Sequence, residues 1–483
     1  MESVSQVSPS PSSDRTTALA SRLDQIGDPA WMRPTLERAI ERLTGQPCRV
    51  NHSHVGYCKI KPHREIQVSL TAHLAGVHSA DEPGQHFSMS FYPSQETGYE
   101  KFCEATRTPP SNFVTQRLEQ SGYLLPAVYL PESAVIVRVF PVDEGLPELG
   151  RITTPESLLP LLAPDSADEP TALAGRFNYH VLHYKPGRSC TLHYRLNGTS
   201  SPNRETVGKI YRDHRGERCH GLLETSWQVA QQRGTWRAAR PVGYEPRWNF
   251  VLQEMIAGRQ FRHLFRELTP DDATTQQLAE VSRYLAAVAH ALHDMQTATV
   301  QLPATAMLDF HKLLASQQNN LNHLSRTHTD LAKEIKRIRQ ELVRVEAASP
   351  PAEPVFCHGD FAHGNVLIDV DNNQAPVGII DFDRAGLAEP AYDVAYFLTH
   401  LWSFGVRHPK RQPHIGPLCE FFRQAYLEIA PQVTLNRLAL YEAFDFSAYV
   451  LRNFRKQSHQ ENWRAWARLQ IEAAWQRLEV AAA

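Results

Sequence analysis

VFCHGDFAHGNVLIDVDNNQAPVGIIDFDRAGLAEPAYDVAYF, residues Val355–Phe397, is the stretch that decides the fold. Within it two apolar runs, Val366–Ile368 and Val377–Ile380, flank the polar residues Asp371–Asn373. An apolar run, a short polar turn and a second apolar run are typical of a β-hairpin. The stretch therefore predicts two antiparallel strands joined by a tight turn.

Oxygen-bearing side chains stand at both ends of this predicted hairpin. Asp360 and Asn365 precede the first strand, and Asp381 follows the second. Because antiparallel strands bring these two ends together, the three side chains should converge. Carboxylate and amide oxygens suit Mg²⁺, which takes one or two carboxylates and completes its shell with water and phosphate. The sequence therefore predicts a site for a hard cation here.

The stretch resembles the catalytic segment of the aminoglycoside phosphotransferase/choline kinase-like family. In that family the pattern is HGD, four residues, N, and then a strand followed by an I-D-[FW]-[DE] turn. The resemblance implies that Asp360 is the catalytic base, which takes the proton of the substrate hydroxyl. It also implies that Asn365 and Asp381 are the metal ligands. The alternative is that these acids only cap the turns of an ordinary hairpin.

Three more residues of the stretch have supporting roles by this resemblance. They are His358, Asp383 and Asp393, the last bracing the catalytic loop from the helix that follows. One departure from the family pattern is visible, because many members carry His-Pro before the Gly-Asn and this chain has Ala362-His363. We expect the departure to affect loop packing more than the metal ligands.

Composition sets broad limits on the chain. Its 483 residues suggest about three domains, and 42% hydrophobic with 21% charged residues is typical of a soluble globular protein. The net charge of −2 gives no general attraction to nucleic acid or anionic membrane. No apolar run approaches the roughly 20 residues that span a bilayer. Residues 1–29 start as a Ser/Pro-rich stretch without a secretory signal and predict a disordered tail. The seven scattered cysteines predict reduced thiols in a cytoplasmic protein.

Residues 166–256 contain the parts of a kinase N-terminal lobe. Lys209 lies in the apolar strand Val207-Gly-Lys-Ile210, and the helix predicted over 216–231 carries Glu224 on its inner face, with Glu217 as the competing partner. A buried ammonium without a partner is costly, so we expect ATP phosphates and a helix glutamate to neutralise Lys209, as in kinases. The alternative is that Lys209 reaches solvent from an edge strand.

Two further segments of this lobe are expected to meet the nucleotide. The turn Lys185-Pro-Gly-Arg188 has a single glycine, so few backbone N–H groups can cradle phosphate and Arg188 is expected to help by charge. The segment Phe250–Gly258 resembles the strand and hinge between kinase lobes. Backbone groups near Glu254 and Ile256 would then contact the adenine edge.

Residues 30–165 repeat the order of turns, strands and helix found in this lobe. A Lys-Pro-x-Arg turn occurs at 61–64 and again at 185–188, and each is followed by an alternating strand. Residues 87–105 align with 206–224, and 126–140 align with 241–255, without gaps. Ser90 then stands where the second copy has Lys209. We interpret the first copy as a degenerate lobe that binds no nucleotide. The alternative is two unrelated α+β segments that share a turn.

Residues 257–483 predict a helical C-terminal lobe. A helical insertion is expected at 303–349, where apolar residues repeat at three-four spacing. This insertion could form a coiled-coil dimer, but we favour intramolecular packing because the family has substrate-facing helices in this place. The row Trp463, Trp466 and Trp475 is more typical of a core stripe than of a sugar- or anion-binding wall.

The fold class expected is thus α+β, a bilobal protein-kinase-like fold with an extra N-terminal domain. The function expected is transfer of phosphate from ATP, with Mg²⁺, to the hydroxyl of a small molecule. A polycationic acceptor is not favoured, because the acids near the C-terminus hardly outnumber the basic residues. The alternatives are a catalytically silent binding module and a protein kinase, the latter disfavoured because no APE-bounded activation loop follows Asp381. Nucleic acid and membrane are not expected as partners, and a homodimer is an option.

Overall fold

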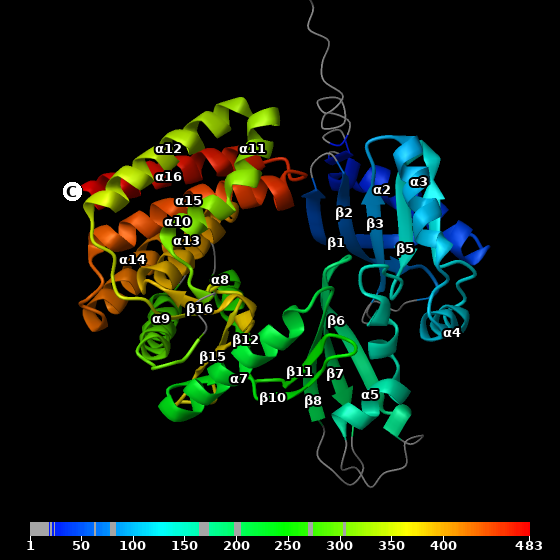
Figure 1. The fold of residues 1–483 in the computed structure, drawn as a ribbon, viewed down its shortest axis with the longest axis horizontal. Coiled ribbons are helices and arrows are strands. Elements are labelled where there is room, and N and C mark those ends of the chain that lie inside the picture. Colours follow the sequence, from blue (N-terminus) through cyan, green and yellow to red (C-terminus); the bar gives the residue numbers. More distant parts are fainter. Residues whose placement is uncertain are drawn as a thin grey trace, which may run out of the picture. The chain divides into compact units, whose positions relative to one another are not determined.

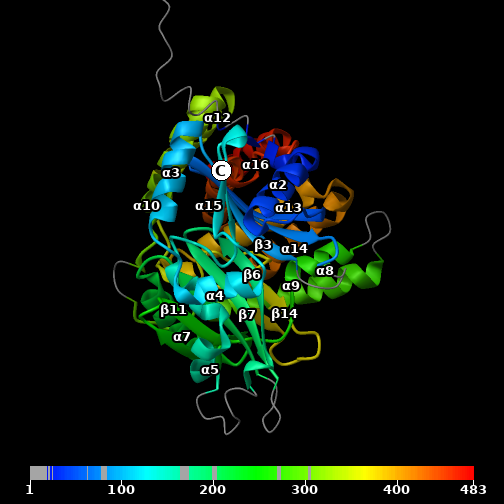
Figure 2. The ribbon, with the colours of Figure 1, turned by 90° about the vertical axis from the view of Figure 1, so that its right-hand side faces the viewer.

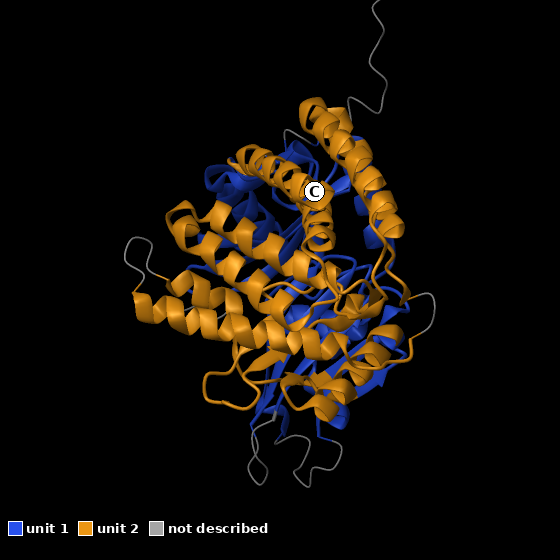
Figure 3. Ribbon diagram, turned by 90° about the vertical axis from the view of Figure 1, so that its left-hand side faces the viewer, with its two compact units in different colours: residues 1–217, 243–252, 455–461 blue, residues 218–242, 253–454, 462–483 orange. Residues whose placement is uncertain are grey.

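The structure is a computed structural model of the chain, drawn as ribbons in Figures 1 and 2. It describes residues 19–483 except 20–21, 24, 62–63, 78–83, 164–172, 198–203, 269–273 and 303–305. The chain divides into two compact units (Figure 3). Unit 1 is Met1–Glu217, Gly243–Leu252 and Arg455–Glu461, and unit 2 is Arg218–Val242, Gln253–Phe454 and Asn462–Ala483. Each unit is described by itself.

The first sheet of unit 1 has, among the described residues, the strand order β1-β2-β3-β5-β4. Neighbouring strands are antiparallel. The strands are β1 (Val50–Lys61), β2 (Glu65–Leu74), β3 (Gln85–Phe91), β4 (Ala127–Leu130) and β5 (Val135–Val139). The helices of this part are α2 (Pro29–Thr44), α3 (Gln95–Arg107), α4 (Asn112–Gln120) and α5 (Pro155–Leu162).

The two faces of the first sheet differ because side chains alternate along each strand. Ile66, Val68 and Leu70 of β2 face a hydrophobic core, which they share with α2. Helix α2 begins where the Asp28 side chain accepts the Ala30 N–H, and it ends at Gly45 in the left-handed region. The opposite face carries polar residues such as Gln67 of the same strand. One face is therefore a conventional core, and the other is available for polar contacts.

The second sheet has the order β10-β11-β8-β7-β6, which read backwards is the connectivity of the first sheet. Its strands are β6 (Phe177–Lys185), β7 (Ser189–Leu196), β8 (Arg204–Tyr211), β10 (Pro241–Glu245) and β11 (Phe250–Glu254). Helix α7 (Arg215–Arg233) follows β8 as α3 follows β3.

The turns that open the two sheets also agree. The Arg64 N–H donates to the Lys61 carbonyl at 3.1 Å, and the Arg188 N–H donates to the Lys185 carbonyl at 3.0 Å. The middle of the first turn, residues 62–63, lies outside the described residues. The shared strand order and turn contacts support the duplication, which we retain as a proposal.

Unit 2 combines short strands with helices around one core. The strands are β9 (Trp236–Ala238), β12 (Arg259–Gln260), β13 (Val355–Cys357), β14 (Val366–Ile368), β15 (Val377–Ile379) and β16 (Gly386–Ala388). The helices are α8 (Phe261–Glu267), α9 (Thr275–Gln296), α10 (Phe310–Ser316), α11 (Gln318–Thr327), α12 (Thr329–Ala348), α13 (Ala391–Arg407), α14 (Gln412–Ile429), α15 (Leu435–Gln457) and α16 (Trp463–Ala482). A β-rich N-terminal part and a helical C-terminal part make up the expected protein-kinase-like fold.

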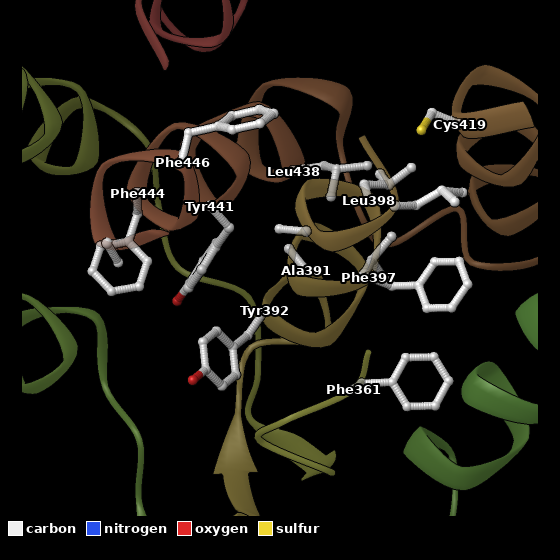
Figure 4. Close-up of a cluster of buried hydrophobic side chains, with 14 of the residues drawn as sticks. Phe361, Ala391, Tyr392, Phe397, Leu398, Cys419, Leu438, Tyr441, Phe444 and Phe446 are labelled. Atoms are coloured by element: carbon white, nitrogen blue, oxygen red, sulfur yellow. The ribbon is translucent and has the colours of Figure 1, made fainter. Parts of the chain in front are cut away.

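The core of unit 2 reaches the predicted catalytic loop. Figure 4 shows Phe361 of that loop beside Phe397 of α13, with ring centroids 5.6 Å apart. Tyr392 of the same helix lies near Tyr441 of α15, with ring centroids 6.1 Å apart. Burial of such rings fixes the loop, because large aromatic side chains contribute much of the packing energy of a core.

The helical insertion packs within the chain. Helix α12 contacts α11 and α16. Its apolar residues Leu331, Ile335 and Ile338 are buried in the core of unit 2. Intramolecular packing thus accounts for the apolar row that also suggested a coiled coil. Trp463 is buried in the same core, and Trp466 and Trp475 pack against it, as expected for a core stripe.

The remaining observations concern the ends and the surface of the chain. Leu19, Leu23 and Ile26 are buried in the core of the first sheet, so ordered chain begins before residue 30, while residues 1–18 lie outside the described residues. All seven cysteines fall in the described part of the chain, and each is present as a thiol. Within the described residues, no helix has both the length and the apolar character to cross a membrane.

Candidate active site

The predicted hairpin is present in unit 2. Strands β14 and β15 pair antiparallel, with Val366 opposite Ile379, and the Ile380 N–H donates to the Asn365 carbonyl at 3.0 Å. This last bond continues the ladder to the point where Asp381 leaves the strand. Asp381 has φ 67°, in the left-handed region. Non-glycine residues rarely adopt this conformation, and those that do are often found at functional sites.

The Asp360 carboxylate is oriented by a hydrogen bond and an ion pair. The Tyr396 hydroxyl donates to Asp360 Oδ1, and Arg384 Nη1 lies 3.8 Å from the same oxygen. Burial by itself raises the pKa of Asp360, but the Arg384 charge and the Tyr396 hydrogen bond outweigh it, so the pKa lies below its ordinary value. Asp360 is therefore an ionised carboxylate near neutral pH, as a proton acceptor must be.

Asn365 and Asp381 lie on the same side as Asp360. Asn365 Nδ2 donates to the Asp360 carbonyl at 2.9 Å, so this bond uses the amide N–H and leaves Oδ1 as an acceptor. The charge of Asp381 raises the pKa of Asp360, which indicates that the two carboxylates are close. In the described part of the chain no three His, Cys, Asp or Glu side chains form a metal cluster. The carboxylate and amide oxygens at this site are donors that suit a cation such as Mg²⁺, which takes one or two carboxylates from the protein.

Asp393 and His358 fix the backbone of the loop. Asp393 accepts the His358 N–H at 2.6 Å and the Gly359 N–H at 2.9 Å. The His358 ring joins two segments, because Nδ1 accepts the Asp360 N–H at 3.2 Å and Nε2 donates to the Ile380 carbonyl at 2.9 Å. Gly359 has φ 77°, and a Cβ there would lie 2.1 Å from the Arg384 carbonyl oxygen. Both the left-handed backbone and this close approach require glycine.

A buried polar network behind Asp360 was missed by the sequence analysis. Arg452 Nη1 donates to the Tyr396 hydroxyl at 2.7 Å and lies 2.6 Å from His400 Nε2. Arg452 Nη2 is 3.9 Å from Asp445. Burial, together with the charge of Asp360, raises the pKa of Asp445 to about 7 in spite of Arg452. The adjacency of Arg384 to the IDFD motif is a usable sequence signal, whereas nothing local connects Arg452 with Asp360.

The Ala362-His363 departure lies in packed surroundings, as expected. His363 is buried, with its ring centroid 5.7 Å from that of Phe404 and 6.0 Å from that of Phe265. Burial, reinforced by Arg407, lowers the pKa of His363 to about 3, so the ring is neutral. Ala362 and His363 therefore both take part in the packing of the loop.

Two predicted nucleotide contacts belong to unit 1. Lys209 lies in β8, with Nζ 5.4 Å from the centroid of the Tyr211 ring. Its cross-strand partner is Thr191 of β7. Arg188 is exposed, and its carbonyl accepts the Arg212 N–H at 2.9 Å. Lys209 is thus on a strand that is paired on both sides, rather than on the edge of the sheet.

The other predicted contacts belong to unit 2, and one differs from expectation. Glu224 is exposed on α7, 3.7 Å from His220 one turn earlier, whereas the sequence analysis placed it on the inner face. Apolar residues such as Leu222 and Leu223 occupy the buried side, because they gain more from leaving water. The Glu254 N–H donates to the Arg240 carbonyl at 2.9 Å, so Glu254 would offer adenine its carbonyl. Ile256 is half-buried.

Comparison with known proteins identifies the class. Residues 192–429 match the "Phosphotransferase enzyme family", and this segment of the chain belongs to that family. The match begins in β7 and ends with α14, so it includes the strand of Lys209 and the whole catalytic hairpin. The first sheet lies outside the match.

The chain is also similar to individual proteins. The chain is 29% identical over 281 residues to an uncharacterized protein of Deinococcus radiodurans, covering 56% of this chain and 77% of that protein. It is 31% identical over 86 residues to a probable choline kinase 3 of Arabidopsis thaliana, covering 18% of this chain and 22% of that protein. A solved GDP complex of an aminoglycoside 2′-phosphotransferase is 15% identical, with a TM-score of 0.42, and covers 67% of this chain and 95% of that chain.

Proposed function

We propose that the protein is a small-molecule kinase that transfers the γ-phosphate of ATP to a hydroxyl group. The observation that carries the proposal is the state of Asp360, an ionised carboxylate oriented by Tyr396 and Arg384 beside Asn365 and Asp381. A base fixed in this way can accept a proton from a hydroxyl that lies within hydrogen-bond reach. The family match supports phosphotransfer as the reaction class.

In the proposed reaction the acceptor oxygen forms a bond to the γ-phosphorus while the bond from that phosphorus to the β,γ-bridging oxygen breaks. The proton of the acceptor hydroxyl passes to Asp360, and ADP leaves with the electron pair of the broken bond. Lys209 is assigned to the ATP phosphates, with Arg188 adding charge at the turn. Mg²⁺, held by Asn365 and Asp381, would neutralise phosphate charge.

Two glutamates of α7 are candidates for the partner of Lys209. Glu224 and Glu217 are both exposed residues of α7, two turns apart. Residues 253–256 are assigned to the adenine, with the backbone of Glu254 and Ile256 at its edge. Both glutamates lie on the outer side of α7, because the helix buries its apolar side.

The charges around the base bear on the acceptor. Arg384 and Arg452 are the basic residues that the contacts connect to Asp360, directly and through Tyr396. Cations beside the base repel a polycationic acceptor, since like charges at short range are unfavourable. We therefore propose an uncharged or anionic hydroxylated metabolite.

The test is transfer of radiolabel from [γ-³²P]ATP to a panel of hydroxylated metabolites in the presence of Mg²⁺. We expect a labelled product with wild type and none with Asp360→Asn, which preserves the shape of the side chain but removes the base. If purified protein binds ATP yet labels no acceptor in a broad metabolite extract, the silent binding module becomes the better interpretation.

A further inference from the structure

A pocket of about 800 Å³ lies on the polar face of the first sheet, entirely within unit 1. Its floor is formed by side chains from three adjacent strands, namely Gln67 of β2, Ser88 and Ser90 of β3, and Arg138 of β5. Register confirms that they are neighbours, because Ser90 pairs with Gln67 and Ser88 pairs with Arg138. The C-terminal part of α3, the loop 141–147 and Pro186–Gly187 form its walls.

The floor of the pocket is polar although it is buried. Ser88 and Ser90 are 3% and 5% exposed, and Arg138 is 7% exposed. Arg138 Nε donates to Glu144 at 2.6 Å, and its Nη1 lies 3.4 Å from the Ser90 hydroxyl. A buried guanidinium and buried hydroxyls are costly unless they have hydrogen-bond partners, and a hydrophobic residue in each position would have closed this face. The sequence instead maintains a polar recess.

The recess is lined by equal numbers of basic and acidic side chains. Its cations are Lys61, Lys101, Arg138 and Arg212, and its acids are Glu65, Glu104, Asp143 and Glu144. Three of the cations are paired with acids of the same wall, namely Lys61 with Glu65 at 2.9 Å, Lys101 with Glu104 at 2.6 Å and Arg138 with Glu144 at 2.6 Å. A balanced, internally paired lining gives no strong attraction to an anion or a cation.

The fourth acid, Asp143, holds the wall to the second sheet. Its Oδ2 accepts the Gly187 N–H at 2.7 Å and the Tyr184 hydroxyl at 2.8 Å. Gly145 comes so close to this turn that a Cβ there would lie 2.6 Å from Gly187 Cα. The wall that faces the turn 185–188 is therefore fixed in place, which favours a pre-formed pocket.

We propose that this pocket binds an uncharged polyhydroxylated molecule of the size of a mono- or disaccharide. Its volume falls within the range of small-molecule sites, about 300–1,000 Å³. Its hydroxyl, amide, guanidinium and carboxylate groups offer both donors and acceptors, which a ring of hydroxyl groups can match. Most of the lining residues belong to the first domain, whereas Pro186 and Gly187 come from the turn 185–188 and Arg212 lies inside the family match. The proposed ligand does not depend on the proposed phosphotransfer.

The position of the pocket also gives the first copy a role. Ser90 aligns with Lys209, so the pocket occupies the sheet face that corresponds to the face carrying Lys209 in the second copy. In the first copy the buried cation comes from β5 instead of the central strand, and Glu144 already neutralises it. The same face would thus have exchanged a phosphate-binding lysine for a hydroxyl-binding surface.

The experiment is saturation-transfer NMR on the full chain with glucose, mannose, galactose, N-acetylglucosamine, sucrose and trehalose, and with ATP and inorganic phosphate as anionic probes. Four proteins are compared: wild type, Thr106→Trp, Cys103→Trp and Asp360→Asn. Thr106 is an exposed residue of α3 that lines the pocket, so tryptophan there fills the mouth without disturbing a core. Cys103 is exposed on the same helix but does not line the pocket, so it provides the matched control.

We expect at least one sugar to give a signal that falls at least fivefold in Thr106→Trp and is unchanged in Cys103→Trp and Asp360→Asn. Ser90→Ala, a milder change, should weaken the binding of that sugar a few-fold. The proposal is overturned if no sugar of the panel loses its signal in Thr106→Trp, or if ATP or phosphate is the probe displaced there. A sugar lost in Asp360→Asn but retained in Thr106→Trp would be an acceptor at the catalytic site, which supports the phosphotransferase and overturns the pocket.

Discussion

The two sheets of unit 1 share a strand order but differ at their central strands. In the second sheet the central strand β8 carries Lys209, and in the first sheet β3 carries Ser90 at the aligned position. The face that corresponds to the one carrying Lys209 holds, in the first sheet, a recess built around a guanidinium that Glu144 neutralises. A common strand order therefore carries different side chains on the corresponding face, and by the two proposals these side chains decide which ligand each sheet binds.

The two sheets also differ in whether they lie in the family match and in which residues they contact. The family match covers β7, β8 and the catalytic hairpin, but not the first sheet. Asp143, in the loop after the first sheet, accepts the Gly187 N–H of the turn 185–188. The Ser69 hydroxyl of the first sheet donates to the Tyr184 carbonyl, just before that turn, at 2.8 Å. The Gly187 N–H is thus already used by Asp143. In this chain the turn can offer phosphate little besides the Arg188 side chain.

The largest effect is expected for Asp360→Asn. If catalysis belongs only to the hairpin and the second sheet, kcat should fall by about 1,000-fold or more because the base is lost, while ATP still binds. Radiolabel transfer and calorimetric ATP titration measure the two quantities. Asp371→Asn, an exposed change in the turn of the same hairpin, is the control and should leave both unchanged. Near-normal kcat in Asp360→Asn would remove this residue from the role of base.

Asp381→Ala should have the next largest effect. Loss of this carboxylate removes a proposed metal ligand, so we expect the Mg²⁺-dependent gain in ATP affinity to fall by about 100-fold. Calorimetric titration with Mg²⁺ and with EDTA separates metal-dependent from metal-independent binding. An unchanged difference between the two conditions would place the metal elsewhere.

Lys209→Ala and Ser90→Ala test the comparison directly. Lys209→Ala removes a cation proposed to bind phosphate, so the affinity for ATP should fall by about 30-fold. Ser90→Ala removes only the aligned hydroxyl, so the affinity for ATP should stay within about twofold of the wild-type value. Titration of wild type should give one ATP per chain. Two ATP per chain, with the second lost in Ser90→Ala, would show that the first sheet is also a working nucleotide lobe.

Tyr396→Phe should have the smallest effect, and it appears in the pH profile. The Tyr396 hydrogen bond helps to lower the pKa of Asp360, so its removal should raise that pKa. Because the ionised carboxylate is the active form, activity is lost as pH falls through the pKa, and the acidic limb should move to higher pH. A structural role alone would lower kcat equally at all pH values and leave the limb in place.

Much of the catalytic loop could be predicted from residues close together in the sequence. The hairpin from Val366 to Ile379 follows from apolar runs and a polar turn, and the pairing confirms it. The approach of Asn365 to the end of β15 follows from antiparallel geometry alone, as the Ile380 to Asn365 hydrogen bond shows. The bracing of the loop by Asp393 was implied by the family pattern and is present. The metal and nucleotide roles of these residues stay predictions.

Other features depended on contacts between distant elements. The face of α7 was misjudged because Glu224 satisfies a helical period on paper, while the buried side is chosen by where Leu222 and Leu223 find apolar neighbours. Tyr396 of α13 and Arg452 of α15 form a hydrogen bond although they are 56 residues apart in the chain. No local spacing encodes such a meeting.

The sequence by itself determined the hairpin that contains Val366–Ile379 and the family of residues 192–429, because turns and short motifs act over a few residues. Only the tertiary structure decided what surrounds Asp360 and what the first sheet does with its second face. Those outcomes depend on desolvation and on side chains brought together from separate elements. Arg138, Ser90 and Glu144 define a recess only once β3, β5 and the following loop are folded together.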